Sequence, residues 1–195
     1  MLLDCNQFFI KEHVGAFKLT DAYDILDPET ETKIGIAREE PPGWAKFLRL
    51  VVNKRMMPTT INVYEADEQT IAFSIRRSFA LFAPKIPITD ATGQEIGHFK
   101  GKTFALKAGF YVNDPQGNRF AEVKGDWKAW TFRFMDSSER EIGTVSKKWA
   151  GMAKEFFTSA DNYMIDINPD VAANPVSKIL LLAAGLAVDM IFKEN

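Results

Sequence analysis

The stretch FYVNDPQGNRFAEVKGD, residues 110–126, decides the fold of this chain. It joins an alternating apolar run to an Asp, a polar turn and a second run, and the chain repeats this arrangement. Five copies begin at Tyr23, Ile61, Ile86, Phe110 and Phe132. Alternation puts one face of a strand in a core, while Asp, Pro, Gly and Ser form the turns between strands. The repeat therefore predicts five consecutive β-hairpins.

The turns have a defined spacing. Three copies place a small residue seven positions after the Asp, as in Asp114 to Ala121, and the first copy places it eight positions after. The weakest copy has Glu65 seven residues before Ala72. Asp at the start of a turn commonly binds the backbone amides beyond it, so we interpret these carboxylates as structural. A Gly in the second strand predicts a bulge or a close approach of another backbone.

Two further segments, QFFIKE around Phe8 and NYMIDIN from Asn162, predict additional strands. A sheet of about a dozen antiparallel strands curls, splits or closes, and closure removes its exposed edges. We therefore expect a mainly β protein, a closed antiparallel barrel of about twelve strands, as a single domain over residues 1–195. A barrel of that width needs something to fill it.

The segment PVSKILLLAAGLAVDMIF is predicted to form a helix that fills the interior of the barrel. Asn174 and Pro175 are a helix N-cap and first helical residue, and the helix is expected over about 175–193. Lys178 and Asp189 leave ten uncharged residues between them, about 15 Å of helix, against a bilayer core of about 30 Å. A helix that is apolar on every side is buried on every side. We expect it to form the core of the barrel, with a membrane span as the alternative.

Composition and charge narrow the classes of function. Hydrophobic residues make up 46% and charged residues 26% of the chain, as in ordinary globular proteins. The formal net charge of −2 gives no general attraction to nucleic acid, so we expect no nucleic-acid partner. Cys5 is the single cysteine, which excludes an intrachain disulfide and fits a reducing compartment. The first residues lack the basic region of an export signal, and a cytoplasmic location is expected.

The hairpins and the terminal helix together resemble a known family. The stretch at 159–194 looks like the C-terminal end of the phospholipid scramblase family, and the segments from His13 and from Ala72 resemble scramblase-related and LURP-one-related proteins. This resemblance, which covers essentially the whole chain, implies the Tubby C-terminal-like fold, a twelve-stranded barrel around a central helix. It implies activities that range from phosphoinositide binding to lipid scrambling.

The segment before the terminal helix predicts a weak calcium site. Asp161 and Asp170 match the proposed calcium segment of the scramblases that this chain resembles. By residue type, Asp166, Asn168 and Asp170 fall at positions 1, 3 and 5 of an EF-hand-like loop, although Val171 stands where that loop requires Gly. Alternation with apolar residues explains the same side chains as the outward face of a strand. We expect no other cofactor.

The stretch GWAKFLRLVVN, from Gly43, is the predicted interaction surface. As a helix it places one apolar stripe along a single face: Trp44, Phe47, Leu48, Val51 and Val52. A basic amphipathic helix of this kind lies on anionic membranes, whereas a helix that caps the barrel would leave its lysine in water. The predicted lipid-binding residues are Trp44, Lys46, Arg49, Lys54 and Arg55.

Catalytic chemistry receives little support from the sequence. His13 and His98 are the two histidines, and neither belongs to a known catalytic or phosphate-binding motif. The basic doublet at Arg76-Arg77 ends a predicted strand, where it either binds phosphate or keeps a strand edge solvated.

We therefore expect a non-enzymatic binding module whose partner is anionic membrane lipid or a phosphoinositide-like headgroup, peripheral to the membrane. The alternatives are lipid translocation with the C-terminal helix inserted, a protein-interaction scaffold with an unknown partner, and an enzyme that uses an acidic pair such as Asp161 and Asp166. Oligomeric state is not predicted.

Overall fold

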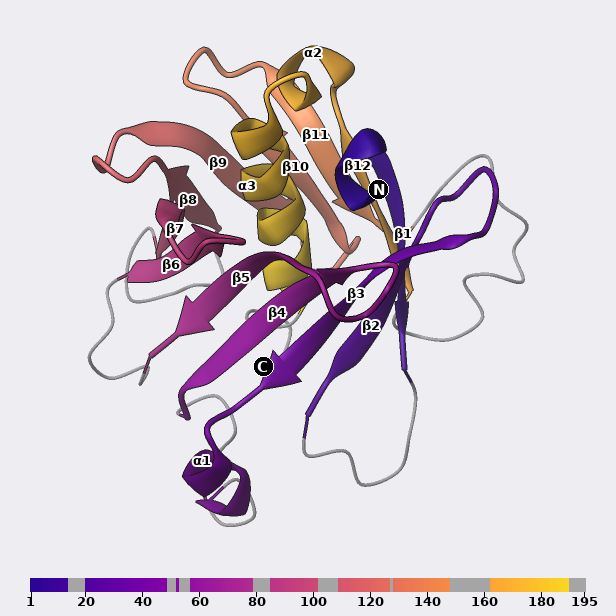
Figure 1. The fold of residues 1–195 in the computed structure, drawn as a ribbon. Coiled ribbons are helices and arrows are strands. Elements are labelled where there is room, and N and C mark those ends of the chain that lie inside the picture. The colour runs from indigo at the N-terminus through magenta and orange to yellow at the C-terminus, as the bar shows by residue number, and fades with distance from the viewer. Residues whose placement is uncertain are drawn as a thin grey trace.

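The computed structural model describes residues 1–13, 20–48, 52, 57–78, 85–101, 109–126, 128–147 and 162–189. In this part of the chain, twelve strands form one closed antiparallel barrel (Figure 1). The strands are β1 (Gln7–Glu12), β2 (Ala22–Leu26), β3 (Lys33–Glu40), β4 (Thr59–Glu65), β5 (Ile71–Arg77), β6 (Lys85–Asp90), β7 (Glu95–Gly101), β8 (Phe110–Asn113), β9 (Arg119–Asp126), β10 (Thr131–Met135), β11 (Glu141–Ser146) and β12 (Tyr163–Ile167). Each strand pairs with its neighbours in sequence, and β1 pairs with β12 to close the sheet. The predicted barrel is confirmed.

Carboxylate side chains stabilise the turns of the five hairpins, as predicted. In the β6–β7 turn, Oδ1 of Asp90 accepts hydrogen bonds from the backbone N–H groups of Thr92 at 2.9 Å and Gln94 at 3.0 Å. Equivalent bonds form at Asp27, Asp114 and Asp136. The β4–β5 turn differs, because Asp67 supplies these bonds and Glu65 instead accepts the N–H of Leu2 at 2.7 Å. These carboxylates therefore stabilise the turns.

Each hairpin also contains a bulge close to its turn. In β6–β7 the register shifts beside Gly97 and leaves Ile96 as the extra residue. A Cβ atom on Gly97 would lie 2.5 Å from the carbonyl oxygen of Asn113 and 2.7 Å from Cδ2 of Leu180. The glycine therefore permits both the neighbouring strand and the central helix to approach, which confirms the predicted close contact. In β4–β5 the matching register position holds Phe73 instead of a small residue.

Helix α3 (Pro175–Ala187) fills the barrel (Figure 1). Oδ1 of Asn174 accepts the N–H of Ser177 at 3.1 Å, which is the predicted N-cap. From Lys178 to Ala187 every residue of the helix is buried. The predicted core helix is thus confirmed as far as Asp189, and residues 190–193 lie outside the described part. Within the described ranges, no helix combines the length and the apolar character needed to cross a bilayer.

The two ends of the barrel differ in structure. One end, here called the turn end, holds the five tight turns at 27–32, 66–70, 91–94, 114–118 and 136–140, together with the 3-10 helix η1 (Leu2–Asp4) and helix α2 (Pro169–Ala172). The α3 helix begins at the turn end, where Nζ of Lys178 donates to the carbonyl of Leu3 at 2.5 Å. The opposite end, called the loop end, carries helix α1 (Gly43–Leu48) between β3 and β4.

Candidate functional site

Helix α1 presents an apolar surface to solvent at the loop end. The side chain of Ala45 is buried, as is that of Met57 after the helix. On the other side, Trp44 is 50% exposed, Leu48 43% and Val52 39%. The N–H of Val52 donates to the carbonyl of Leu48, the last residue of α1, at 2.8 Å. Figure 1 shows α1 lying past the ends of β3 and β4.

Trp44 and Leu48 are four residues apart in α1 and so lie on one helix face, and Val52 follows beyond the end of the helix. We call Trp44, Leu48 and Val52 the apolar ridge. Among the described residues, the other exposed large apolar side chains are Met1 and Val176, and both belong to the turn end. A run of apolar side chains held in solvent marks an interaction surface for a membrane or another protein.

The predicted lipid-binding residues are only partly within the described chain. Trp44 lies on the ridge, and Lys46 is exposed within α1. Arg49, Lys54 and Arg55 lie outside the described residues. Of the predicted stripe, Trp44, Leu48 and Val52 are exposed, while the side chain of Phe47 and the whole of Val51 lie outside the described part.

The predicted calcium residues are spread over β12 and α2. Asp166 is half-buried in β12, opposite Gln7 and Thr144. Oδ1 of Asn168 accepts the N–H of Asp170 at 2.9 Å and so caps α2. Asp161 lies outside the described residues. Across the described ranges, no three His, Cys, Asp or Glu side chains are grouped to hold a metal ion.

A cleft of about 530 Å³ at the turn end brings Asp166 near carboxylates that the sequence pattern did not connect with it. Its lining includes Cys5, Asp27 and Glu29 beside Asp166. Oδ1 of Asp27 accepts the N–H of Glu29 at 2.8 Å, so this carboxylate is already used by its turn. Burial raises the pKa of the Cys5 thiol, which keeps the thiol protonated and poorly reactive.

The turn end is rich in acidic side chains, of which Glu68 is paired with Lys33 and Arg38, and Glu139 with Lys124. The five turns contain one basic residue, Arg140, and, counting Asp90 at the end of β6, the following acidic residues: Asp27, Glu29, Glu31, Asp67, Glu68, Asp90, Asp114, Asp136 and Glu139. A hydrogen bond from the Thr92 hydroxyl lowers the pKa of Asp90, and one from the Asn118 side chain lowers the pKa of Asp114. These groups stay ionised at neutral pH, so this end disfavours contact with an anionic surface.

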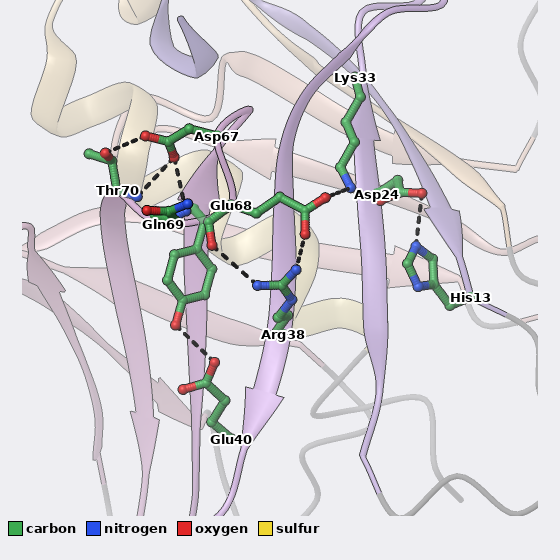
Figure 2. A network of polar contacts seen from close by, with 10 residues as sticks. His13, Asp24, Lys33, Arg38, Glu40, Asp67, Glu68, Gln69 and Thr70 are labelled. Carbon is green, nitrogen blue, oxygen red and sulfur yellow. Dashed lines mark hydrogen bonds and ion pairs between the residues drawn. The ribbon is translucent and has the colours of Figure 1, made fainter.

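A polar network crosses the outer face of β2 and β3 and reaches the β4–β5 turn (Figure 2). Lys33 bridges Asp24 at 2.7 Å and Glu68 at 2.5 Å, and Arg38 also binds Glu68. His13 lies 2.8 Å from Asp24. Burial alone would raise the pKa of Asp24, but hydrogen bonds from Lys33 and His13 outweigh it and lower that pKa. Lys33 and Arg38 thus have carboxylate partners within the protein, and the network links β2, β3 and the β4–β5 turn.

Comparisons with known proteins show which family the chain belongs to. The family model described as Scramblase matches residues 10–195. The chain belongs to the scramblase family. A phospholipid scramblase family protein of Schizosaccharomyces pombe is 29% identical over 79 residues, which cover 39% of this chain and 21% of that protein. The match thus spans about a fifth of the length of this scramblase relative. No solved structure matches the chain. The family that the sequence resembled is confirmed.

Proposed function

We propose that this scramblase-family barrel is a non-enzymatic binding module of the Tubby-like type that attaches peripherally to anionic phospholipid through α1. The observation that supports this proposal is the apolar ridge of Trp44, Leu48 and Val52, held in solvent at one end of the barrel. A cytoplasmic location, expected from the lone Cys5, is part of the proposal.

The ridge has the residue types that membrane interfaces favour. A Trp ring suits the headgroup region, and Leu and Val side chains reach the acyl boundary. Lys46 is exposed beside them, and a cation near an anionic surface contributes about 1 kcal/mol. The sequence adds Arg49, Lys54 and Arg55 within ten residues of Lys46. Apolar contact and charge together give stable but reversible attachment, which screening by salt weakens.

The alternative of lipid translocation by an inserted C-terminal helix receives less support. The residues of α3 from Lys178 to Ala187 are buried inside the barrel, and the helix would have to leave it before entering a bilayer. Its departure would expose the inward faces of twelve strands to water. Peripheral attachment requires no such rearrangement.

The test is co-sedimentation of the full chain with neutral and anionic vesicles at low and high salt. We expect pelleting with anionic vesicles alone, and less of it at high salt. Trp44→Ala combined with Leu48→Ser should reduce binding about tenfold or more, because two exposed apolar side chains that would enter the bilayer are lost. Val176→Ser is the matched control, since Val176 is similarly exposed (44%) but lies at the turn end. Binding of the double variant at the wild-type level would contradict the proposal.

The charge contribution is tested separately. Lys46→Gln should weaken binding to anionic vesicles by about fivefold at low salt and have little effect at high salt. Arg133→Gln removes one positive charge from a side chain that is 65% exposed on the outer face of β10 and should leave binding unchanged. An added calcium arm, with a chelator control, tests the calcium site proposed at Asp166 and Asp170: calcium-dependent pelleting would support that site.

A further inference from the structure

A short N-terminal segment crosses the turn end of the barrel, and we call its residues 2–6 the strap. Leu2 is 0% exposed and belongs to the apolar core, while the carbonyl of Asn6 accepts the N–H of Ile167 at 2.9 Å. Between these two contacts, the carbonyl of Leu3 accepts the hydrogen bond from Lys178 in the first turn of α3. Figure 1 shows this N-terminal turn, in indigo, at the same end of the molecule as α2. The strap therefore joins the barrel wall to the base of the central helix.

The barrel wall provides a seat for Leu2. Gly35 in β3 and Glu65 in β4 are direct partners across the sheet. A Cβ atom on Gly35 would lie 3.1 Å from Cδ1 of Leu2, which is closer than side chains usually pack, so the glycine leaves room for Leu2. Beside it, Oε2 of Glu65 accepts the N–H of Leu2 at 2.7 Å. One apolar contact and one charge-assisted hydrogen bond thus fix the same residue of the strap.

Glu65 is also the point at which the β4–β5 hairpin departs from the repeat of this chain. The other four hairpins have Asp at this position, and each of these Asp residues binds amides of its own turn. In β4–β5 the turn amides bind Asp67 instead, and the longer side chain of Glu65 reaches the strap. Holding the strap accounts for this departure.

Lys178 lowers the cost of lifting the strap. It is the one charged residue of α3 and is 6% exposed. An ammonium group has three N–H donors, and within the described chain this one makes a single hydrogen bond, to the carbonyl of Leu3. A buried charge with donors to spare regains hydration when the segment above it moves away. This gain offsets part of the loss of Leu2 burial, so we expect the strap to lift at a lower cost than unfolding of the whole barrel.

We propose that the strap is a latch. Docked, it holds α3 inside the barrel; lifted, it opens the turn end and exposes Lys178 to water. Any movement of α3 toward the turn end then begins with release of the strap. The proposal does not rest on membrane attachment through α1, which lies at the opposite end of the barrel, so it is tested without vesicles.

Hydrogen exchange of the full chain, followed by mass spectrometry, tests the latch. Glu65→Gln keeps the shape of the side chain but weakens a charge-assisted hydrogen bond, and Leu2→Ala removes the apolar contact. Each variant should speed the exchange of residues 2–12 and of α3 by about fivefold or more, because both segments are released together. Exchange in the β8–β9 hairpin, residues 110–126, should not change.

Thr70→Val is the matched control for Glu65→Gln. The Thr70 hydroxyl donates to Oδ2 of Asp67 at 2.6 Å, so this change also removes a hydrogen bond to a carboxylate in the β4–β5 turn. Because that bond does not involve the strap, Thr70→Val should leave the exchange of α3 at the wild-type rate.

Brief treatment with an amine-acetylating reagent gives a second readout. Lys178 is buried while the strap is docked, so it should react slowly in the wild-type protein and about fivefold faster in the Glu65→Gln and Leu2→Ala variants. Lys85, whose side chain is 47% exposed on β6, is the internal reference and should react equally in all proteins.

Urea unfolding of each variant separates release of the latch from global destabilisation. Faster exchange confined to the strap, its following strand and α3, together with faster acetylation of Lys178, supports the latch. Acceleration of every hairpin by the factor that the loss of global stability predicts overturns it, because the strap then opens only with the whole barrel. Faster exchange of the strap alone, or no change in either variant, overturns it as well.

None of these outcomes depends on vesicle binding, so failure of the latch leaves the proposed function of α1 intact.

Discussion

Two buried tyrosines inside the barrel differ by one hydrogen bond. The hydroxyl of Tyr23 donates to Oδ2 of Asp189 at 2.7 Å, whereas the hydroxyl of Tyr163 has no partner in the described chain. Burial raises the pKa of both side chains far above the usual value, so both stay neutral. A satisfied buried hydroxyl stabilises the fold, and an unsatisfied one destabilises it.

Replacing Tyr by Phe should change the free energy of unfolding in opposite directions at positions 163 and 23. Tyr163→Phe removes a hydroxyl that bonds to nothing and should raise the free energy of unfolding by about 1 kcal/mol. Tyr23→Phe removes a donor from the buried carboxyl of Asp189 and should lower it by about 1 to 3 kcal/mol. Urea unfolding of the three proteins measures both. Equal destabilisation by the two changes would show that the Tyr163 hydroxyl has a partner such as a buried water.

The turn carboxylates predict how stability depends on pH. Hydrogen bonds from the Thr92 hydroxyl, the Asn118 side chain and the Arg140 backbone N–H lower the pKa of Asp90, Asp114 and Asp136 respectively. A carboxyl whose pKa is lower in the folded than in the unfolded chain stabilises the fold above the unfolded value of 3.8. That stabilisation is lost as the pH falls from there through the folded pKa.

We therefore expect the urea midpoint to fall as the pH is lowered below 3.8, the unfolded pKa of Asp. The double variant Asp90→Asn and Asp136→Asn keeps an oxygen acceptor but cannot titrate, so its midpoint should change less over this range. The difference between the two curves isolates the turns from the other carboxylates. Parallel curves would mean that these turns do not contribute to the acid sensitivity.

At the scale of elements, the hairpins were predictable because their determinants are local. The alternation, the Asp and the turn residues all lie within one hairpin, so the sequence contains the whole signal. The weakest copy was misread for the same reason: Glu65 occupies the place of the Asp in the pattern, while Asp67 binds the turn amides. Glu65 and Asp67 are only two residues apart, and which of them reaches the turn amides depends on the path of the backbone, which the pattern does not show.

The candidate site was predictable only in part. The sequence showed Lys46 and the stripe that includes Trp44 as a helical pattern. Which face of α1 is exposed to solvent depends on how the helix packs against the end of the barrel, and the helical pattern alone does not determine this. The small pocket lined by Thr59 and Arg77 depends on the pairing of these two residues, which are eighteen apart in the sequence. A period-2 pattern assigns each residue to a face, but it does not fix which residue of the next strand lies opposite.

The fit between α3 and the barrel wall predicts the effect of widening the helix. Alanine favours helix over glycine by about 1 kcal/mol, but a Cβ on Gly185 would lie 2.4 Å from Cδ1 of Ile165 in β12. Overpacking of this kind costs about 1 to 3 kcal/mol. Gly185→Ala should therefore lower the free energy of unfolding in spite of its better helix propensity.

A second substitution tests the cause. Ile165→Val removes the Cδ1 atom, so the double variant should be more stable than the sum of the two single changes predicts, by about 1 kcal/mol. Gly43→Ala is the control, because a Cβ there meets no atom within 4 Å. Strict additivity in the double variant would show that the contact with Cδ1 of Ile165 is not what limits the width of α3.

At the scale of the whole molecule, the barrel has unlike ends. The tight turns place acidic side chains at one end, and their hydrogen-bonded carboxylates remain charged. The apolar ridge and the pocket lined by Arg76 and Arg77 lie at the other end. In the proposed attachment to an anionic bilayer through α1, the acidic turns face away from the bilayer, so attachment should also fix the orientation of the barrel.

This orientation can be read with single labels, because Cys5 is the one cysteine of the chain. In a Cys5→Ser background, Val52→Cys and Val176→Cys place a polarity-sensitive fluorophore at the loop end and the turn end, on side chains of similar exposure (39% and 44%). With anionic vesicles the label at position 52 should brighten and shift to the blue, because it enters the apolar boundary, while the label at position 176 stays in water. Neutral vesicles should change neither signal. A response at position 176 that equals or exceeds that at position 52 would mean that the barrel meets the membrane by another surface, and then the ridge on α1 would be a site for a protein partner.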